Sequence, residues 1–227
     1  MVKIFIDPGH GGSDPGAVGN GLQEKNLTLQ IAKRIESILK NEYTGATVKL
    51  SRTGDQTLSL KQRTDMANKW GADYFISIHI NAGGGTGYED FIYNGNVSSK
   101  TIAYQNVMHE EITKAVNFKD RGKKRANFHV LRETKMPAFL SENGFIDNTA
   151  DAKKLKDSTF IEKIARGHVN GLVRAFGLKK KGTTKPTQAK TNDKLYRVQV
   201  GAFADKKNAE KLAAELKKKG YDVYITN

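Results

Sequence analysis

Short apolar runs alternate with segments of helical spacing along the first 178 residues of the chain. Residues 73–80 are almost continuously apolar and β-branched, which predicts a buried strand. Across residues 24–40, apolar positions recur every three or four residues, which predicts a helix with one buried face. The same patterns predict strands at 2–6, 48–50, 88–93, 128–131 and 138–141, and helices at 58–70, 98–116 and 160–176. This alternation is typical of an α/β layer fold.

The pattern changes after residue 178. Residues 179–193 contain one alanine and otherwise only polar residues, glycine and proline, so nothing in this basic segment offsets the entropy lost on ordering. The last 33 residues, 195–227, predict a β-α-β unit with a strand at 195–200, a helix at 206–219 and a strand at 221–226. We therefore expect three parts: a main domain at 1–178, a flexible linker at 179–193 and a small unit at 194–227.

Basic residues are concentrated in this tail. The formal net charge of the 227-residue chain is +14, and residues 179–227 contribute +8 of it. Such a balance predicts attraction to a polyanion, which is nucleic acid, an anionic membrane surface or an anionic wall polymer. The alternative is that the lysines only solvate a helix and a linker. Because the tail has no recognised nucleic-acid-reading motif, we expect no nucleic-acid partner.

Composition excludes several classes of protein. The hydrophobic fraction of 37% is that of a globular chain, and no apolar run is long enough to span a bilayer, so we expect no membrane insertion. The absence of Cys excludes disulfides, thiolate metal ligands and Cys nucleophiles. The apolar stretch at 2–6 is too short for a signal peptide and is followed by Asp7, so we expect a protein made in the cytoplasm.

Two of the five histidines follow strands that are predicted to be buried. His10 enters a Gly-rich loop after the first strand, and His79 lies where the strand at 73–80 ends. Ligands gather beyond the carboxyl ends of strands in an open α/β sheet, and Glu24 at the start of a helix offers an oxygen nearby. Two His and one carboxylate with an open fourth position are typical of catalytic zinc. The alternative is that backbone carbonyls satisfy both rings and the helix dipole favours Glu24.

Glu142 comes at the end of another apolar strand. A carboxylate in that position is costly unless it has a partner or a role. Beside a metal-activated water it would act as general base. The pattern therefore predicts a hydrolytic site at which His10, Glu24 and His79 hold one Zn²⁺ ion and Glu142 moves the proton.

Other polar residues are weaker candidates. Asn81, His129 and Arg63 are candidate substrate contacts, and His129 would help to hold an oxyanion. Their alternative roles are a strand-end cap for Asn81 and a helix-surface cation for Arg63. His109 is expected on a solvated helix face, and His168 as a half-buried structural residue.

Four blocks in this order resemble the zinc-dependent N-acetylmuramoyl-L-alanine amidases of bacterial cell-wall lysis, over residues 2–177. The blocks are VKIFIDPGHGG with DPGA (2–12 and 14–17), EKNL (24–27), SIHINA (77–82) and PAFLSENGF (137–145). The resemblance is closest to sporulation-associated amidases of Gram-positive spore formers and to phage endolysins. It implies a mixed, mostly parallel twisted sheet flanked by helices.

The same resemblance implies roles for particular residues. The family's zinc ligands match His10, Glu24 and His79, and its catalytic glutamate matches Glu142. The reaction implied is cleavage of the amide between the lactyl group of N-acetylmuramic acid and L-alanine of the stem peptide. The loop between His10 and Glu24 is too short for the lid helix of the autoinhibited branch, so we expect an open groove and no activator. We also expect the protein to act on the wall after its release from the mother cell or the phage-infected cell.

The tail resembles one half of the sporulation-related (SPOR) peptidoglycan-binding repeat, through LYRVQVGAF (195–203), NAEKL (208–212) and GYDVY (220–224). This resemblance implies peptidoglycan as partner, and the basic charge adds anionic wall polymers. A lone half repeat leaves three alternatives open: it pairs with a second chain, it lies against the main domain, or it is a truncated remnant. Its exposed strand edge motivates the hypothesis of a homodimer through strand pairing.

Two alternative functions remain open at this point. A zinc peptidase that cuts inside the stem peptide would use the same metal chemistry with a different subsite. A non-catalytic protein that binds the wall or nucleic acid would explain the basic tail, but it would have no need of Glu142 facing a His-Glu-His set.

Overall fold

The computed structural model describes residues 1–181, 200–218, 220, 221, 223 and 225. The chain divides into two compact units, Met1–Gly182 and Thr183–Asn227. Within the described residues, no helix combines the length and the apolar character needed to cross a membrane.

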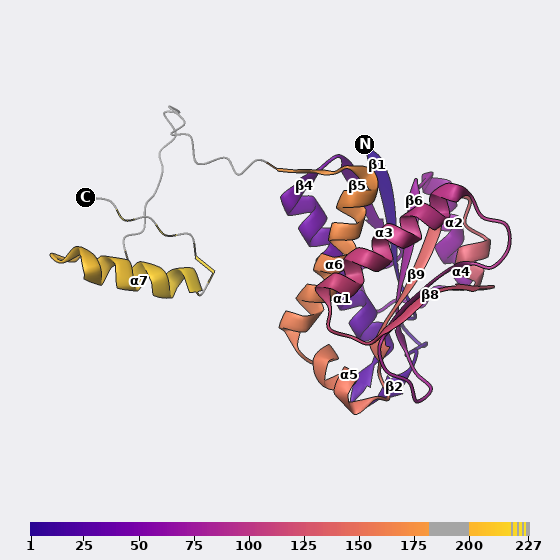
Figure 1. The fold of residues 1–227 in the computed structure, drawn as a ribbon, viewed down its shortest axis with the longest axis horizontal. Coiled ribbons are helices and arrows are strands. Elements are labelled where there is room, and N and C mark those ends of the chain that lie inside the picture. The colour runs from indigo at the N-terminus through magenta and orange to yellow at the C-terminus, as the bar shows by residue number, and fades with distance from the viewer. Residues whose placement is uncertain (182–199, 219, 222, 224, 226–227) are drawn as a thin grey trace. The chain divides into compact units, whose positions relative to one another are not determined.

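A six-stranded sheet forms the centre of the first unit (Figure 1). Neighbouring strands pair in parallel except for β9 and β7, which are antiparallel, so β7 and β8 run opposite to the other four. The expected mixed, mostly parallel sheet is confirmed, and the carboxyl ends of β1, β6 and β9 lie at one edge of it. In spatial order the strands are β5 (Ala46–Leu50), β1 (Val2–Pro8), β6 (Tyr74–Asn81), β9 (Ala138–Phe145), β7 (Tyr88–Tyr93) and β8 (Asp120–Ala126).

Helices pack on both faces of this sheet. One face is covered by the three long helices α1 (Glu24–Glu42), α3 (Ser99–Ala115) and α6 (Ser158–Phe176), which enclose the larger apolar cluster. Within the described part of the first unit, the other face is covered by α2 (Leu60–Trp70) and the short α4 (His129–Arg132), over a smaller cluster that includes Phe5 and Phe75. Because strand residues alternate between faces, His79 lies on the same face as Phe75. The candidate site therefore opens on the less covered face.

The remaining elements are short. The helix α5 (Thr149–Leu155) follows β9. A small hairpin joins β2 (Val18–Gly19) to β3 (Leu22–Gln23). A separate two-stranded antiparallel sheet pairs β4 (Tyr43–Thr44) with β10 (Lys179–Lys180), which is distant in the chain. The β10 pairing shows that Lys179 and Lys180, which the sequence analysis placed in the linker, are part of the first unit.

Local sequence signals explain where several helices begin and end. Ser59 and Gln62 form a reciprocal capping box at the start of α2, and Gly71 ends that helix with a φ of 66°. Asp157 accepts a hydrogen bond from Thr159 N at the start of α6, and a left-handed Gly177 follows its end.

One predicted strand is wrong. Residues 128–131 begin the helix α4, in which Val130 and Leu131 are buried against the sheet. The strand of this region is instead β8, eight residues upstream, which the sequence analysis missed. Its sequence, DRGKKRA, is almost entirely polar because β8 is the outer strand of the sheet and is partly exposed along its length.

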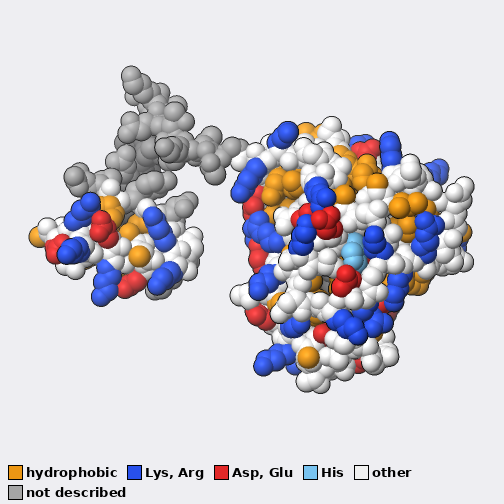
Figure 2. Space-filling model, viewed as in Figure 1, with side chains coloured by type: hydrophobic (Ala, Val, Ile, Leu, Met, Phe, Trp, Pro, Cys, Tyr) orange, Lys and Arg blue, Asp and Glu red, His pale blue; other side chains and the backbone are white. Residues whose placement is uncertain are grey.

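The second unit contains the expected helix, α7 (Lys206–Lys218). Lys and Arg side chains are spread over its visible face (Figure 2). The strand expected at 195–200, with the dimerising edge, lies outside the described residues except for Val200, as do residues 222, 224 and 226 of the final strand. Val200, Tyr221, Val223 and Ile225 are described and are not in a strand. Residues 182–193 of the predicted linker also lie outside the described ranges.

Candidate active site

His10, Glu24 and His79 come together beyond the carboxyl ends of β1 and β6. The Glu24 carboxylate bridges the two rings, with Oε1 2.9 Å from His79 Nδ1 and Oε2 3.1 Å from His10 Nε2. The ring centroids are 5.0 Å apart. One candidate ligand atom from each residue lies within 4.8 Å of the other two. Two imidazole nitrogens and one carboxylate oxygen in this arrangement form a suitable donor set for a metal ion.

Glu24 is held by backbone donors as well as by the rings. Ile80 N donates to Oε1 at 3.0 Å, and Ala17 N donates to Oε2 at 2.9 Å. The residue is 4% exposed. Because α1 begins at Glu24, the carboxylate occupies the helix N-terminus, where the dipole favours a negative charge.

Two buried arginines hold the loop that carries His10. His10 has a φ of 60°, a left-handed conformation that is uncommon for a residue other than glycine. Arg52 and Arg63 together donate hydrogen bonds to the carbonyl oxygens of residues 8–10, and Arg63 also donates to Asp7. Arg63 is 3% exposed. Its contacts give it a positioning role behind the site, and Arg52, which shares this role, was missed from the sequence.

Two glycines allow the loop to pack closely around the ligand set. A Cβ on Gly9 would lie 2.3 Å from Cε1 of His79. A Cβ on Gly16 would lie 2.6 Å from both Glu24 Oε2 and His10 Cδ2, and Gly16 has a φ of 65°. The segment between His10 and Glu24 contains the β2–β3 hairpin and no helix, as its length predicted.

Asp14 is a further site residue that sequence reasoning did not assign. His10 Nδ1 lies 2.8 Å from Asp14 Oδ2, so the ring donates its Nδ1–H to the carboxylate. This contact leaves His10 Nε2 directed at Glu24 as an acceptor for a metal. Asp14 itself is ordered by a hydrogen bond from Gly16 N to its Oδ1. The sequence analysis gave Asp14 only as part of the DPGA motif, and the fold shows which imidazole it contacts.

The contacts among the three candidate ligand residues shift the pKa of each of them. Burial disfavours the charged form of His10, but the hydrogen bonds and negative charges of Glu24 and Asp14 together outweigh burial and raise the pKa of His10 to about 9. Burial alone would lower the pKa of His79, but the hydrogen bond to Glu24 and the negative charges of Glu142 and Glu24 together raise it. The two rings hold the pKa of the buried Glu24 well below its usual range. Metal binding must therefore displace protons from the imidazoles.

Glu142 lies beside the ligand set on the neighbouring strand. It pairs in register with His79, so the two side chains point to the same face of the sheet. Its Oε2 is buried and has no hydrogen-bond partner within the described ranges. Burial raises the pKa of Glu142 to about 8 despite the neighbouring His79. A carboxyl group with these properties is suited to accept and return a proton.

The other candidates have different surroundings. Asn81 Nδ2 donates to Glu89 Oε1 at 2.9 Å, which places its amide next to the strand that flanks Glu142. His129 opens α4, and its buried Nε2 has no hydrogen-bond partner in the described part of the chain. His109 was expected on a solvated face, which is wrong: it is 9% exposed, and its Nδ1 lies 2.6 Å from the buried Asp90.

His168 contacts the strand that carries Glu142, and it is fully buried rather than half-buried as expected. It lies on α6, where Nδ1–H donates to Ile164 O and Nε2 accepts from the hydroxyl of Ser141, the residue before Glu142. Burial lowers the pKa of His168 to about 4. The ring is therefore neutral in the folded protein at ordinary pH.

This depressed pKa predicts a loss of stability in mild acid. The unfolded chain takes up a proton on this residue below its ordinary pKa of about 6.5. The folded protein takes up this proton only near pH 4. The stability that the neutral His168 ring contributes is therefore complete above pH 6.5 and is lost as the pH falls toward 4. The difference between the pKa of His168 in the unfolded and the folded chain corresponds to roughly 3 kcal/mol of unfolding free energy. Urea unfolding across this range should give a steeper acid slope for wild type than for His168→Gln, and parallel slopes would contradict the assignment.

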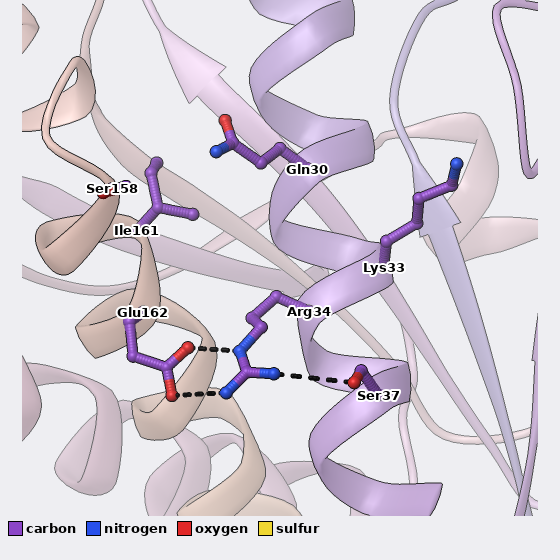
Figure 3. A pocket seen from close by; sticks show the side chains of 7 residues that line it. All are labelled: Gln30, Lys33, Arg34, Ser37, Ser158, Ile161 and Glu162. Atoms are coloured by element: carbon purple, nitrogen blue, oxygen red, sulfur yellow. Dashed lines mark hydrogen bonds and ion pairs between the residues drawn. The ribbon is translucent and has the colours of Figure 1, made fainter. Parts of the chain in front are cut away.

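A separate depression lies between α1 and α6 (Figure 3). Arg34 points across it to form a two-pronged ion pair with Glu162, and it also donates to Ser37. The depression holds none of the candidate ligands or Glu142. Its lining residues are Gln30, Lys33, Arg34, Ser37, Ser158, Ile161 and Glu162.

Comparison with known proteins agrees with this geometry. The family model for N-acetylmuramoyl-L-alanine amidase matches residues 4–174, and the SPOR domain model matches residues 178–227. The N-acetylmuramoyl-L-alanine amidase CwlM of Bacillus licheniformis is 62% identical over 225 residues, which cover 99% of this chain and 85% of that protein. The endolysin of Bacillus phage SPP1 is 43% identical over 200 residues, 83% of this chain and 73% of that protein.

A solved structure shares the fold. The catalytic domain of the amidase CwlV from Bacillus (Paenibacillus) polymyxa var. colistinus matches with a TM-score of 0.74 and 38% identity, covering 79% of this chain and 100% of that chain. Fold and site place the protein among the cell-wall hydrolases built on this α/β sheet. The chain belongs to the N-acetylmuramoyl-L-alanine amidase family, and it hydrolyses peptidoglycan and carries a C-terminal SPOR domain.

Proposed function

We propose that the amidase binds one Zn²⁺ ion through His10, Glu24 and His79 and that Glu142 is its general base. The observation that carries this proposal is the convergence of three candidate ligand atoms within 4.8 Å, beside the strand position of Glu142, whose buried Oε2 has no hydrogen-bond partner among the described residues. Zinc suits this donor set, because two ligands about 2.0–2.1 Å from a tetrahedral ion lie roughly 3.3 Å apart, and the two Glu24 oxygens lie 2.9 Å from His79 Nδ1 and 3.1 Å from His10 Nε2.

In such sites Zn²⁺ supplies Lewis-acid polarisation of a carbonyl and a lower pKa for a water molecule. The protein's own groups account for the other steps. Asp14 keeps a proton on His10 Nδ1, so that Nε2 stays available. Glu142 takes a proton from the attacking water and transfers it to the nitrogen of L-alanine as the amide breaks. A nearby cation favours the charged form of Glu142, which prepares it to act as a base.

The test is metal removal and restoration with analysis of the products. Purified protein should clear a suspension of bacterial walls, lose this activity with a chelator and regain it with Zn²⁺. Mass spectrometry should find new N-terminal L-alanine on peptides released from intact glycan chains. Cleavage inside the stem peptide would support the alternative peptidase, and hydrolysis that survives metal removal would contradict the zinc assignment.

Asp14 offers a graded test of the metal site. Asp14→Ala removes the group that orients His10, and a loss of this kind costs about 10- to 100-fold in metal affinity. Competition with a zinc-binding dye measures this change. Asp65→Ala is the matched control, because Asp65 is also exposed and bonded to a side chain four residues away, but on α2. Equal zinc affinity in the two variants would show that Asp14 does not orient His10 for metal binding.

We also propose that the basic second unit adds electrostatic affinity for anionic wall polymers. Support comes from the SPOR match and from the exposed lysines of α7. Retention of the protein on walls should fall steeply with salt, and it should fall on walls stripped of their anionic polymers. Retention that is insensitive to both would leave only binding to the glycan.

A further inference from the structure

A pair of basic side chains lies two strands beyond Glu142, on β8. Glu89 on β7 pairs in register with Glu142, so the two side chains share a face of the sheet. Glu89 Oε2 accepts a hydrogen bond from Arg121 Nε and another from Lys124 Nζ, both at 2.6 Å. Both cations come from the outer strand β8. The order across the sheet is thus His79, Glu142, Glu89 and then the two cations.

A β-bulge explains why both cations point the same way. Residues 121 and 124 are three apart and would face opposite sides of a regular strand. The pairing of β7 with β8 shifts register between Tyr88 and Asp90, where Gly122 adopts a φ of 84°. The extra residue turns both side chains toward Glu89. Lys123, by contrast, bonds to Asn106 on α3, on the other face.

Arg121 and Lys124 keep a net positive charge and free hydrogen-bond donors after they bind Glu89, within the described residues. One carboxylate faces two cations, which leaves one positive charge in excess. Side-chain exposures of 30% for Arg121 and 37% for Lys124 keep them accessible, whereas Glu89 is 6% exposed. Within the described residues, no hydrogen bond engages the Nη atoms of Arg121, and its guanidinium lies 4.9 Å from the centre of the Phe145 ring. A guanidinium held by one edge can bind a further carboxylate with the other.

The proposed reaction places the start of the stem peptide beside Glu142, and the basic pair is within reach of a peptide that runs from there toward β8. Because Glu142 returns its proton to the leaving nitrogen, that nitrogen lies next to Glu142, and the stem peptide extends from there. Strands are about 4.8 Å apart, so the cations lie roughly 5–10 Å beyond Glu142. An extended peptide covers about 3.3–3.6 Å per residue, so this distance corresponds to the second or third residue of the stem.

We propose that Arg121 and Lys124 form a subsite that binds the stem-peptide carboxylate nearest to the scissile amide. The proposal rests on the proposed function, since it takes Glu142 as the group beside the leaving nitrogen. Glu89 is its positioning residue, because it fixes both cations and lowers their conformational freedom. The bulge at Gly122 sets their direction.

The test uses two matched muramoyl peptides that differ at the second stem residue, which carries either a free α-carboxylate or the corresponding carboxamide. Wild type should cleave the carboxylate form with a kcat/KM about 10- to 100-fold higher, mainly through KM. Arg121→Gln and Lys124→Gln should each reduce this preference without a matching loss on the carboxamide. Lys123→Gln is the control on the same strand and should keep the wild-type preference.

Two results would overturn the subsite: a wild type that does not distinguish the substrates, or variants that lose the same factor on both. Thermal unfolding of each variant identifies a folding defect, and Lys124→Gln carries the test if Arg121→Gln unfolds. Failure of the proposed function is a different result, because wild type would then cut elsewhere than before L-alanine or act without metal.

Discussion

Glu142→Gln is expected to lower kcat for peptidoglycan hydrolysis by roughly 10²- to 10⁴-fold, the usual contribution of a positioned acid–base group. Glutamine has the same shape but cannot take a proton from water or return one to the leaving nitrogen. Because Glu142 makes no hydrogen bond through Oε2 in the described structure, the substitution breaks no existing contact of that atom. Removing a buried carboxyl group should also leave the fold at least as stable as before.

The measurement compares turnover of a soluble muramoyl peptide with zinc content in the same preparations. Glu142→Gln should hold as much zinc as wild type and bind substrate with a similar KM, so that the loss is confined to kcat. Glu133→Gln is a suitable control, since Glu133 is an exposed glutamate that pairs with Arg132 and has no assigned role in the reaction. Activity of Glu142→Gln within tenfold of wild type would refute the general-base assignment.

The clustering of the three candidate ligand residues could be predicted from sequence because each marks an element boundary. His10 and His79 follow apolar strands, and Glu24 begins an amphipathic helix, so topology alone brings all three to one sheet edge. The functional importance of Glu142 could be proposed from sequence, because burying a carboxylate at the end of an apolar strand costs free energy unless the group has a partner or a role. The long elements of the sheet and its helix layers were predictable from their strong apolar periodicity.

What the sequence left unassigned depends on contacts between distant residues. Arg52 has no local signal that it will bond to the backbone of the loop after β1, 43 residues earlier in the chain. The strand β8 is polar because it is an outer strand, so its sequence carries no apolar pattern that predicts a strand. Since Arg121 and Lys124 lie on this strand, the missed element also concealed the basic pair two strands beyond Glu142.

Glu24→Ala is expected to remove both zinc and hydrolysis. The substitution deletes the only oxygen ligand of the proposed set and leaves two buried backbone donors, Ala17 N and Ile80 N, without their acceptor. The loss of affinity should exceed the roughly 100-fold upper range for removing an orienting partner such as Asp14. Stability should fall as well, because His10 and His79 lose the carboxylate that holds their pKa values above the ordinary range.

Together, Glu24→Ala and Glu142→Gln separate metal binding from proton transfer. Both variants should be inactive on walls, but elemental analysis should find zinc in Glu142→Gln and none in Glu24→Ala after the same dialysis. Added zinc that saturates wild type should rescue neither. If Glu24→Ala retained a full complement of zinc, the ion would have to be held by other residues, and the bridging carboxylate between the two rings would be a structural contact. The opposite pattern, zinc lost from Glu142→Gln, would make Glu142 a ligand and leave the reaction without its assigned base.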